Sequence, residues 1–130
     1  MPQYASFRDE LRYRGGINMW AWALHRVTGL GVLLFLCIHI LETFTVSLGP
    51  SFYNHTMELY NTPLFKIGEI GLLFAVLYHA INGIRITLQD FFPKLWRYNR
   101  AMLWGSFTIL LIVYVPLVVW GLLPLFRGEL

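Results

Sequence analysis

The chain has 130 residues, of which 57% are hydrophobic, 17% aromatic and only 13% charged. A typical soluble domain is about 25% charged, so this composition argues against a soluble globular protein, and its hydrophobicity excludes intrinsic disorder. The single cysteine excludes a disulfide framework. A net charge of only +3, with little wet surface to carry it, argues against nucleic-acid binding.

Three segments are long and apolar enough to cross a bilayer, which takes about 20 residues. They cover residues 19–48, 64–88 and 101–126. The apolar part of the first is too long for a signal peptide, and no small-residue cleavage site follows it, so we interpret it as a retained span. The connections, residues 49–63 and 89–100, are short, and we expect His55 and Glu58 to lie in a polar, solvated loop. No repeat or second domain is visible, so residues 1–130 are predicted to form one all-α domain, an up-down-up bundle of three transmembrane helices.

The positive charges indicate how the spans are oriented. Eight of the ten lie at the N-terminal side or around the second connection: Arg8, Arg12, Arg14, Arg26, Arg85, Lys94, Arg97 and Arg100. Only Lys66 and Arg127 belong to the opposite side. Because Lys and Arg accumulate on the cytoplasmic side, the N-terminus and the second connection are predicted to face the cytoplasm. The protein is then a multi-pass protein of the cell membrane.

Several ionisable residues lie within the spans, where they are costly and usually face the bundle interior. Helical spacing places His25, Gly29 and His39 on one inward face of the first span. A second-span stripe rich in small residues consists of Gly68, Leu72, Ala75, His79, Gly83, Ile86 and Asp90. Small residues allow a helix or a flat ring to approach the backbone closely.

The depths of the histidines suggest what they bind. If Arg26 and Arg85 both mark the cytoplasmic boundary, His79 lies about 9 Å deeper and His39 about 20 Å deeper, at 1.5 Å per residue. The two histidines then occupy levels about 10 Å apart, which is unsuitable for one shared metal. Single histidines on such faces suit axial ligation of haem, each with a second ligand from another chain. Arg26, Arg85 and His25 are available for the propionates.

Other interpretations stay open. An intramembrane histidine can simply hydrogen-bond across helices, and Arg26 and Arg85 can extend to the membrane surface. Asp90 can cap its helix or pair with an arginine. A small transporter or proton channel would use the same charges, but it predicts discontinuous helices or internal repeats, and neither is clear here.

Two motifs resemble a known family. Residues 24–29, LHRVTG, resemble the HRxTG or HRxSG signature of the cytochrome b membrane-anchor subunit of succinate dehydrogenase. Residues 78–85, YHAINGIR, followed by Asp90, resemble that family's second signature, HxxxGxR with a later Asp. The resemblance covers nearly the whole chain and agrees with its length, its three spans and their orientation.

The resemblance implies roles for individual residues. His79 would be an axial ligand of haem b, opposite a histidine of a partner anchor subunit. His25 and Arg26 would lie near the propionates and the quinone site, and Arg85 would also reach a propionate. Asp90 would pair with cations at that boundary, close to the quinone site.

Two departures and one extra histidine refine this expectation. Trp22 stands where many members have a serine implicated in quinone binding, so it either stacks on the quinone ring or anchors the helix. Ile86 stands where many have a histidine after Arg85. Members with two haems have a first-span histidine that ligates the distal haem. His39 therefore predicts a two-haem type, with His79 as the proximal ligand.

The implied function is to anchor a succinate dehydrogenase in the membrane and to pass electrons to quinone. The implied partners are a second three-helix anchor, an iron–sulfur subunit and a flavoprotein subunit, which would hold the succinate chemistry. This chain resembles neither a flavin fingerprint nor a cysteine-cluster motif, so alone it should not oxidise succinate. The alternatives are a haem-free anchor, or a fumarate reductase anchor running in the reverse direction.

Overall fold

The computed structural model describes residues 16–60 and 62–127. These residues form the helices α2 (Gly16–Phe44), α3 (Pro50–Tyr60), α4 (Pro63–Phe91) and α5 (Asn99–Arg127), and the 3-10 segments η1 (Thr45–Leu48) and η2 (Pro93–Tyr98). Three stretches of this part of the chain are long and apolar enough to cross a membrane. The prediction of an all-α membrane protein with three spans is therefore confirmed. Arg8, Arg12 and Arg14, which contribute to the predicted orientation, lie outside the described residues.

The helix ends follow from local sequence. Pro63 opens α4 directly after Thr62, whose backbone is extended, because proline has its φ preset for the first helical turn and lacks an N–H that would go unpaired. The helix stops before Pro93, since the residue preceding a proline is disfavoured in the helical region; Phe92 has φ −126° and ψ 79°. Local chemistry thus decides where the central span begins and ends.

The first connection differs from the prediction. Residues 49–63 are not a loop, because they contain the helix α3, which begins at Pro50 after Gly49 at φ 109°. His55 and Glu58 are solvated as expected, with side chains 79% and 80% exposed. The loop prediction rested on polarity, but polarity does not exclude a short helix lying at a membrane surface.

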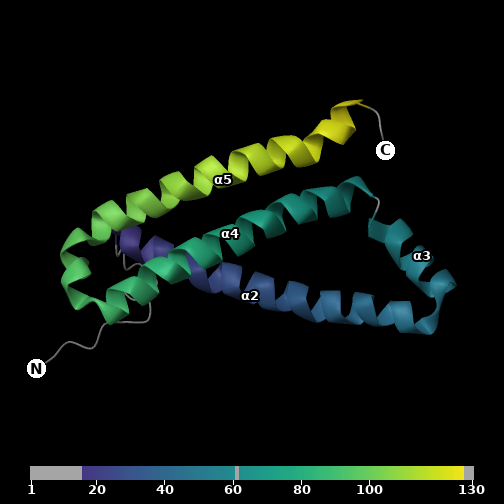
Figure 1. The fold of residues 1–130 in the computed structure, drawn as a ribbon, viewed down its shortest axis with the longest axis horizontal. Helices are drawn as coiled ribbons and strands as arrows, with labels where there is room; N and C mark the ends of the chain where they lie inside the picture. The colour runs from purple at the N-terminus through teal and green to yellow at the C-terminus, as the bar shows by residue number, and fades with distance from the viewer. Residues whose placement is uncertain (1–15, 61, 128–130) are drawn as a thin grey trace, which may run out of the picture.

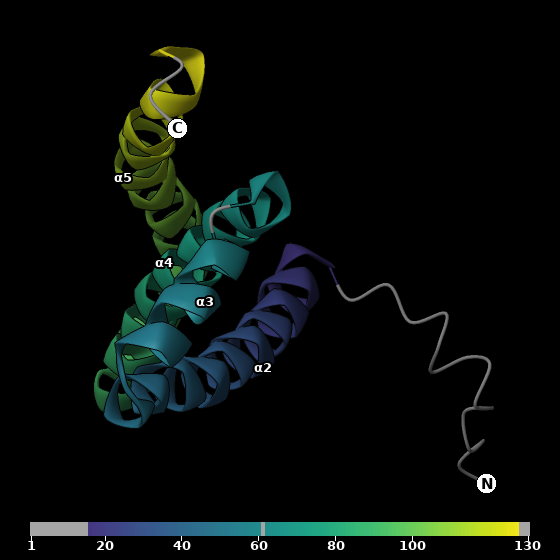
Figure 2. The same ribbon diagram turned by 90° about the vertical axis from the view of Figure 1, so that its right-hand side faces the viewer.

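Helix α4 occupies the centre of the fold and packs against both α2 and α5 (Figure 1). Helix α2 crosses α4 near the start of α2 and then separates from it toward α3, and Figure 2 shows α2 and α5 on different sides of α4. We call residues 16–32, 77–91 and 99–110 the closed end, and residues 33–60 and 63–76 the open end. The two ends place their histidines in different surroundings.

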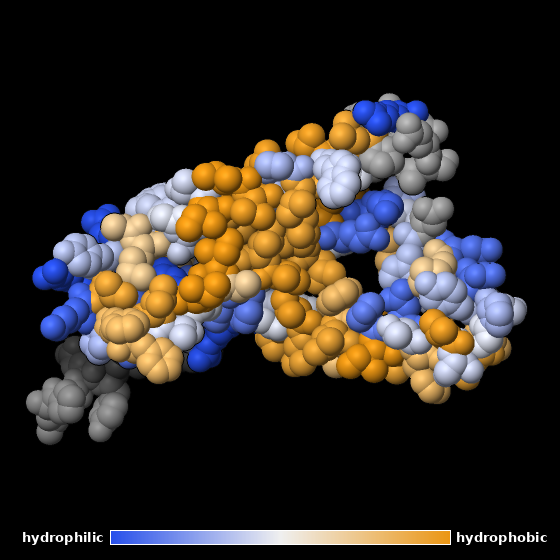
Figure 3. All heavy atoms as spheres, viewed as in Figure 1, coloured by the Kyte–Doolittle hydropathy of each residue, from blue (hydrophilic) through white to orange (hydrophobic). Residues whose placement is uncertain are grey.

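The eight buried residues of the described part of the chain all lie at the closed end, and four of them are polar or charged. They are Ala21, Thr28, Tyr78, Asn82, Arg85, Gln89, Leu103 and Leu110. The large apolar side chains point outward, and Figure 3 shows hydrophobic atoms across the middle of the molecule, with hydrophilic atoms gathered toward its two ends. Apolar outer surfaces of this kind fit helices that are surrounded by lipid or by other membrane helices.

Candidate functional site at the closed end

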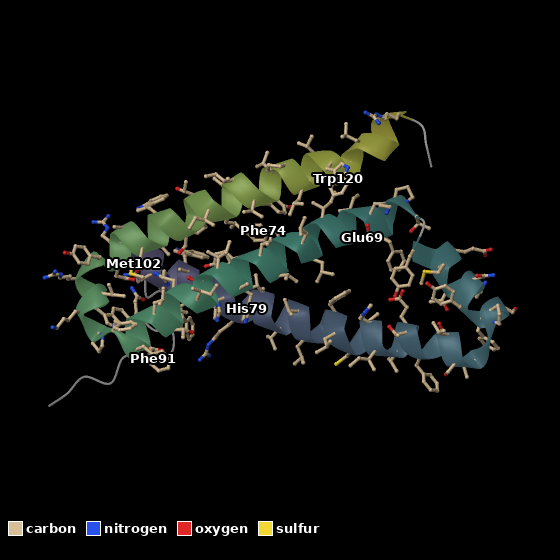
Figure 4. The ribbon with its side chains drawn as sticks, in the orientation of Figure 1. Glu69, Phe74, His79, Phe91, Met102 and Trp120 are labelled. Atoms are coloured by element: carbon tan, nitrogen blue, oxygen red, sulfur yellow. The ribbon has the colours of Figure 1, made fainter. Side chains whose placement is uncertain are left out.

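His25 and His79 meet where α2 crosses α4, and Figure 4 shows His79 at this crossing. Their rings stack with centroids 4.0 Å apart and planes within 8°. His79 Nδ1 lies 3.0 Å from the backbone oxygen of His25. Because a carbonyl oxygen can only accept, Nδ1 is the donor in this contact, and in the neutral ring the lone pair is then on Nε2. Histidines that bind metals are commonly oriented by a second hydrogen bond of this kind.

A glycine makes this approach possible. A Cβ atom added to Gly29 would lie 2.8 Å from Cε1 of His79 and 3.2 Å from its Nδ1, too close to be accommodated without movement. A Cβ atom on Gly83 would lie 3.6 Å from Cε1 of His25, which is ordinary contact. Gly29 is therefore needed for the close approach of the His79 ring to the backbone of α2. Gly31, two residues further along α2, faces open space.

Thr28 links the first motif to His79. Its side chain is buried, and Oγ1 donates to the backbone oxygens of Leu24 at 2.7 Å and His25 at 3.0 Å. The carbonyl of His25 thus receives both the threonine hydroxyl and the His79 ring nitrogen. A threonine hydroxyl that bonds to a carbonyl of the preceding turn often bends the helix slightly. Thr28 therefore influences the position of the His25 carbonyl, which orients His79.

A second polar cluster lies on the neighbouring face of α4, where the three long helices meet. Tyr78 donates its hydroxyl hydrogen to the backbone oxygen of Ala21 at 2.9 Å. The buried polar residues of this face, at spacings of four, three and four, are Tyr78, Asn82, Arg85 and Gln89. The sequence interpretation overlooked this face because it concentrated on the small residues beside His79. The four polar residues at helical spacing were the signal that would have revealed it.

Asn99, the first residue of α5, holds the end of this cluster together. Its Oδ1 accepts from Arg85 Nη1 at 3.0 Å and from Gln89 Nε2 at 2.9 Å, and its Nδ2 donates to Asn18 Oδ1 at 3.0 Å. The described residues include no carboxylate within ion-pair distance of Arg85. Among the described residues, Arg85 is therefore a buried cation whose only hydrogen-bond partner is the neutral Asn99.

Trp22, Arg26 and Asp90 lie on the outer surface of the closed end. All three are exposed, and the Arg26 guanidinium lies over the Trp22 ring, 4.1 Å from its centroid. The spacing of four residues brings these two side chains together on one helix face. The pair therefore presents a flat ring and a cation to whatever adjoins this surface.

His39 is placed differently from the other predicted site residues. His25 and Gly29 lie on the inward face predicted for them and adjoin α4. The His39 side chain, which was predicted to share that face, is 55% exposed at the open end. Its Nδ1 lies 3.7 Å from Glu42 Oε2, a neighbour that the sequence interpretation missed although the spacing of three residues predicts contact. His39 follows Gly29 by ten residues, so it lies about 15 Å along α2 from the level of His79.

Glu42 also joins α2 to α3. The side chain of Tyr60 forms a hydrogen bond with Glu42. Desolvation, with a further contribution from the Glu42 carboxylate, raises the pKa of the Tyr60 phenol. The phenol therefore remains protonated at neutral pH and can donate to the carboxylate.

Among residues 16–60 and 62–127, no group of three or more His, Cys, Asp or Glu side chains could hold a metal ion. A metal ion held by three or more protein ligands would therefore need at least one ligand from beyond these residues. A porphyrin iron, which takes four ligands from its own ring, needs only a single ligand from this chain.

The fold and this crossing define a three-span membrane protein that holds a histidine pair between its first two spans. A family model described as "Succinate dehydrogenase/Fumarate reductase transmembrane subunit" matches residues 2–119. The chain belongs to this family, and the resemblance to a succinate dehydrogenase membrane-anchor subunit is confirmed.

Three relatives are similar over different shares of the chain. The "Succinate dehydrogenase 2 membrane subunit SdhC" of Mycobacterium tuberculosis is 43% identical over 104 residues, which are 80% of this chain and 76% of that protein. The "Succinate dehydrogenase hydrophobic membrane anchor subunit" of Halobacterium salinarum is 36% identical over 56% of this chain and 57% of its own length. The subunit of the same name from Archaeoglobus fulgidus is 34% identical over 54% and 60%.

Proposed function

We propose that this membrane anchor binds haem b through Nε2 of His79, with the opposite axial ligand supplied by a second three-helix anchor subunit. The observation that carries the proposal is the bond from His79 Nδ1 to the His25 carbonyl, because it selects the tautomer whose Nε2 can ligate iron. Gly29 supports the proposal, because the absence of a side chain at this position leaves just enough room for the His79 ring. When bound, haem supplies a one-electron carrier in the path to quinone.

The burial of Arg85 supports the presence of an anionic group beside His79. An unpaired buried charge costs on the order of several kcal/mol, yet Arg85 has only the neutral Asn99 as its hydrogen-bond acceptor in the described chain. A haem propionate would neutralise it. The buried Nε of Arg85 and Nδ1 of His25 have no hydrogen-bond partner within the described residues.

A second haem at His39 would require a surface from another chain. His39 lies about 15 Å along α2 from the His79 level, and more than half of its side chain is exposed in this chain alone. A helix of the partner anchor laid along the open end would cover it and supply the opposite ligand. The Glu42 carboxylate would then orient the ring from its Nδ1 side.

The quinone site is assigned to the outer surface formed by Trp22, Arg26 and Asp90. A flat ring and a cation suit a quinone, because the cation stabilises the negative charge that develops during reduction. This surface would face the cytoplasm and the iron–sulfur subunit, through which electrons would arrive from succinate at the flavoprotein. A fumarate reductase would use the same parts in the reverse direction.

The haem proposal is tested on the complex purified from its native membrane, by a reduced-minus-oxidised spectrum and a pyridine-haemochrome assay. We expect two haems for each copy of this chain. One haem per chain would remove the role of His39 as a ligand, and no haem would leave a haem-free anchor.

The quinone proposal has a separate test. Arg26→Leu should lower succinate-dependent quinone reduction at least tenfold, while electron transfer from succinate to a water-soluble acceptor stays at the wild-type rate. Equal rates of quinone reduction in variant and wild type would place the quinone elsewhere.

A further inference from the structure

An open groove lies between α4 and α5 at the closed end. Its volume is about 360 Å³, which is within the range of about 300–1,000 Å³ that ligand sites occupy. The surface of the groove is almost wholly apolar, and its apolar lining consists of Ile81, Ile84, Leu88, Met102, Gly105 and Ile109. From Ile81 to Leu88 the wall formed by α4 is about 10 Å long, at 1.5 Å per residue. The groove therefore covers roughly a third of the hydrocarbon core of a bilayer.

The two polar residues of the lining, Arg85 and Ser106, already make hydrogen bonds within the chain. Ser106 donates to the Met102 carbonyl at 2.8 Å, and Arg85 Nη1 donates to Asn99 Oδ1 at 3.0 Å. The Nε atom of Arg85 is itself buried. Gly105 leaves free space, since a Cβ atom at this position would meet nothing within 4 Å. The groove therefore suits an apolar chain better than a polar ligand.

Exposed positive charges lie at the end of this groove, where a short segment connects α4 to α5 (Figure 1). The connection and the first turn of α5 carry Lys94, Arg97 and Arg100, which are all exposed. None of these three forms an ion pair with a carboxylate of the described residues. Asp90 is the only acidic residue between positions 77 and 110, so the net charge here is positive. Basic sites between transmembrane helices attract the headgroups of anionic lipids.

A second groove between the same two helices provides a comparison. It is lined by Lys66 and Glu69 together with apolar residues and Gly121, toward the other end of α5. Lys66 Nζ lies 3.1 Å from Glu69 Oε2, so the charge of this lysine is already paired. Of the two grooves, only the one at the closed end combines an apolar surface with neighbouring cations that lack an ion pair among the described residues.

We propose that the groove at the closed end binds an anionic phospholipid. Part of one acyl chain lies along the groove beside Gly105, and the phosphate lies among the cations of the connection, which long lysine and arginine side chains can reach. The charges favour a lipid over a helix of another subunit, since an apolar helix would bring no anion to them. Neither His39 nor His79 lines the groove, so failure of this proposal would leave the haem proposal intact.

Native mass spectrometry of the purified complex tests the charge requirement. The complex is stripped of lipid in detergent and then incubated with phosphatidylglycerol or with phosphatidylcholine that has the same acyl chains. We expect several-fold more phosphatidylglycerol to be retained. The triple variant Lys94→Gln/Arg97→Gln/Arg100→Gln should retain phosphatidylglycerol only at the level of phosphatidylcholine. Equal retention of the two lipids by the wild type, or an unchanged preference in the triple variant, overturns the proposal.

Gly105→Leu tests the groove itself, because the leucine side chain would occupy the space of the acyl chain. Gly121→Leu is the matched control, since Gly121 is a glycine of α5 that also faces open space, in the second groove. Retention of phosphatidylglycerol should fall several-fold in Gly105→Leu and stay at the wild-type level in Gly121→Leu. Equal retention in the two variants overturns the proposal. Loss of another subunit from Gly105→Leu alone would place a protein helix in the groove, which also overturns it.

Discussion

The histidines of the closed and open ends differ in how far their own chain packs around them. At the closed end, His79 is stacked on His25, bonded to a backbone carbonyl and fitted against Gly29, all within one chain. At the open end, His39 is more than half exposed and has near neighbours only from its own helix, Phe35 and Glu42, among the contacts of the described residues. His79 is thus oriented by its own subunit, whereas the His39 side chain is largely exposed within the described residues.

This difference has a physical cause. Helices can approach closely where small residues lie between them, and Gly29 and Gly83 lie at the crossing of α2 and α4. Beyond the crossing, the two helices separate toward α3 (Figure 1), and side chains such as Phe35 and Leu72 border the space between them. The comparison predicts that the two histidines respond differently to mutation.

His79→Ala should have the largest effect. The haem proposed for the closed end would lose its ligand, and roughly half of the haem content should disappear from a two-haem complex, measured by pyridine haemochrome against protein. His55→Ala is the matched control, since His55 is a solvated histidine of α3, and it should keep the full content. Undiminished haem in His79→Ala would refute the assignment of the ligand.

His39→Ala should remove only the second haem and leave the spectrum of the first unchanged. The reason is the separation of about 15 Å along α2 between the two levels, which lets one site empty without disturbing the other. Reduced-minus-oxidised spectra of the two single variants should sum to the wild-type spectrum. A variant that retains both haems would mean that His39 serves helix packing alone.

Gly29→Ala should weaken the closed end without abolishing it. The added methyl group would meet the His79 ring at 2.8 Å, and overpacking of this kind costs about 1–3 kcal/mol. We expect a lower Tm and partial loss of haem, measured by thermal unfolding and by haem retention on detergent dialysis. Gly31→Ala, two residues further on and facing open space, should be neutral. Similar losses in both variants would indicate a general helix effect.

Tyr60→Phe should have the smallest effect, because it removes only the hydrogen bond between α3 and Glu42. The expected cost is about 1 kcal/mol, visible as a small decrease in Tm with unchanged haem content. Since the folded protein raises the pKa of this phenol above its ordinary value of 10.0, the bond contributes fully below about pH 10 and is lost as the pH rises beyond it. The difference in Tm between variant and wild type should therefore vanish only in strong alkali.

Much of the site was predictable from the sequence because hydropathy, helical spacing and rise per residue are local properties. They predicted the three spans, the two motifs, and the separate levels of His39 and His79. The helical conformation of residues 50–60 was missed, since a polar segment between spans carries no clear helical period.

The tertiary structure decided which atoms meet. Nothing in the local pattern shows that His79 Nδ1 bonds to the His25 carbonyl, because that contact depends on where α2 crosses α4. The burial of Asn82, Arg85 and Gln89 likewise depends on two helices packing against α4 at once. The sequence by itself thus determined that this chain crosses the membrane with histidines at two depths. Only the packing of the helices fixed the orientation of His79 and left His39 on an exposed surface.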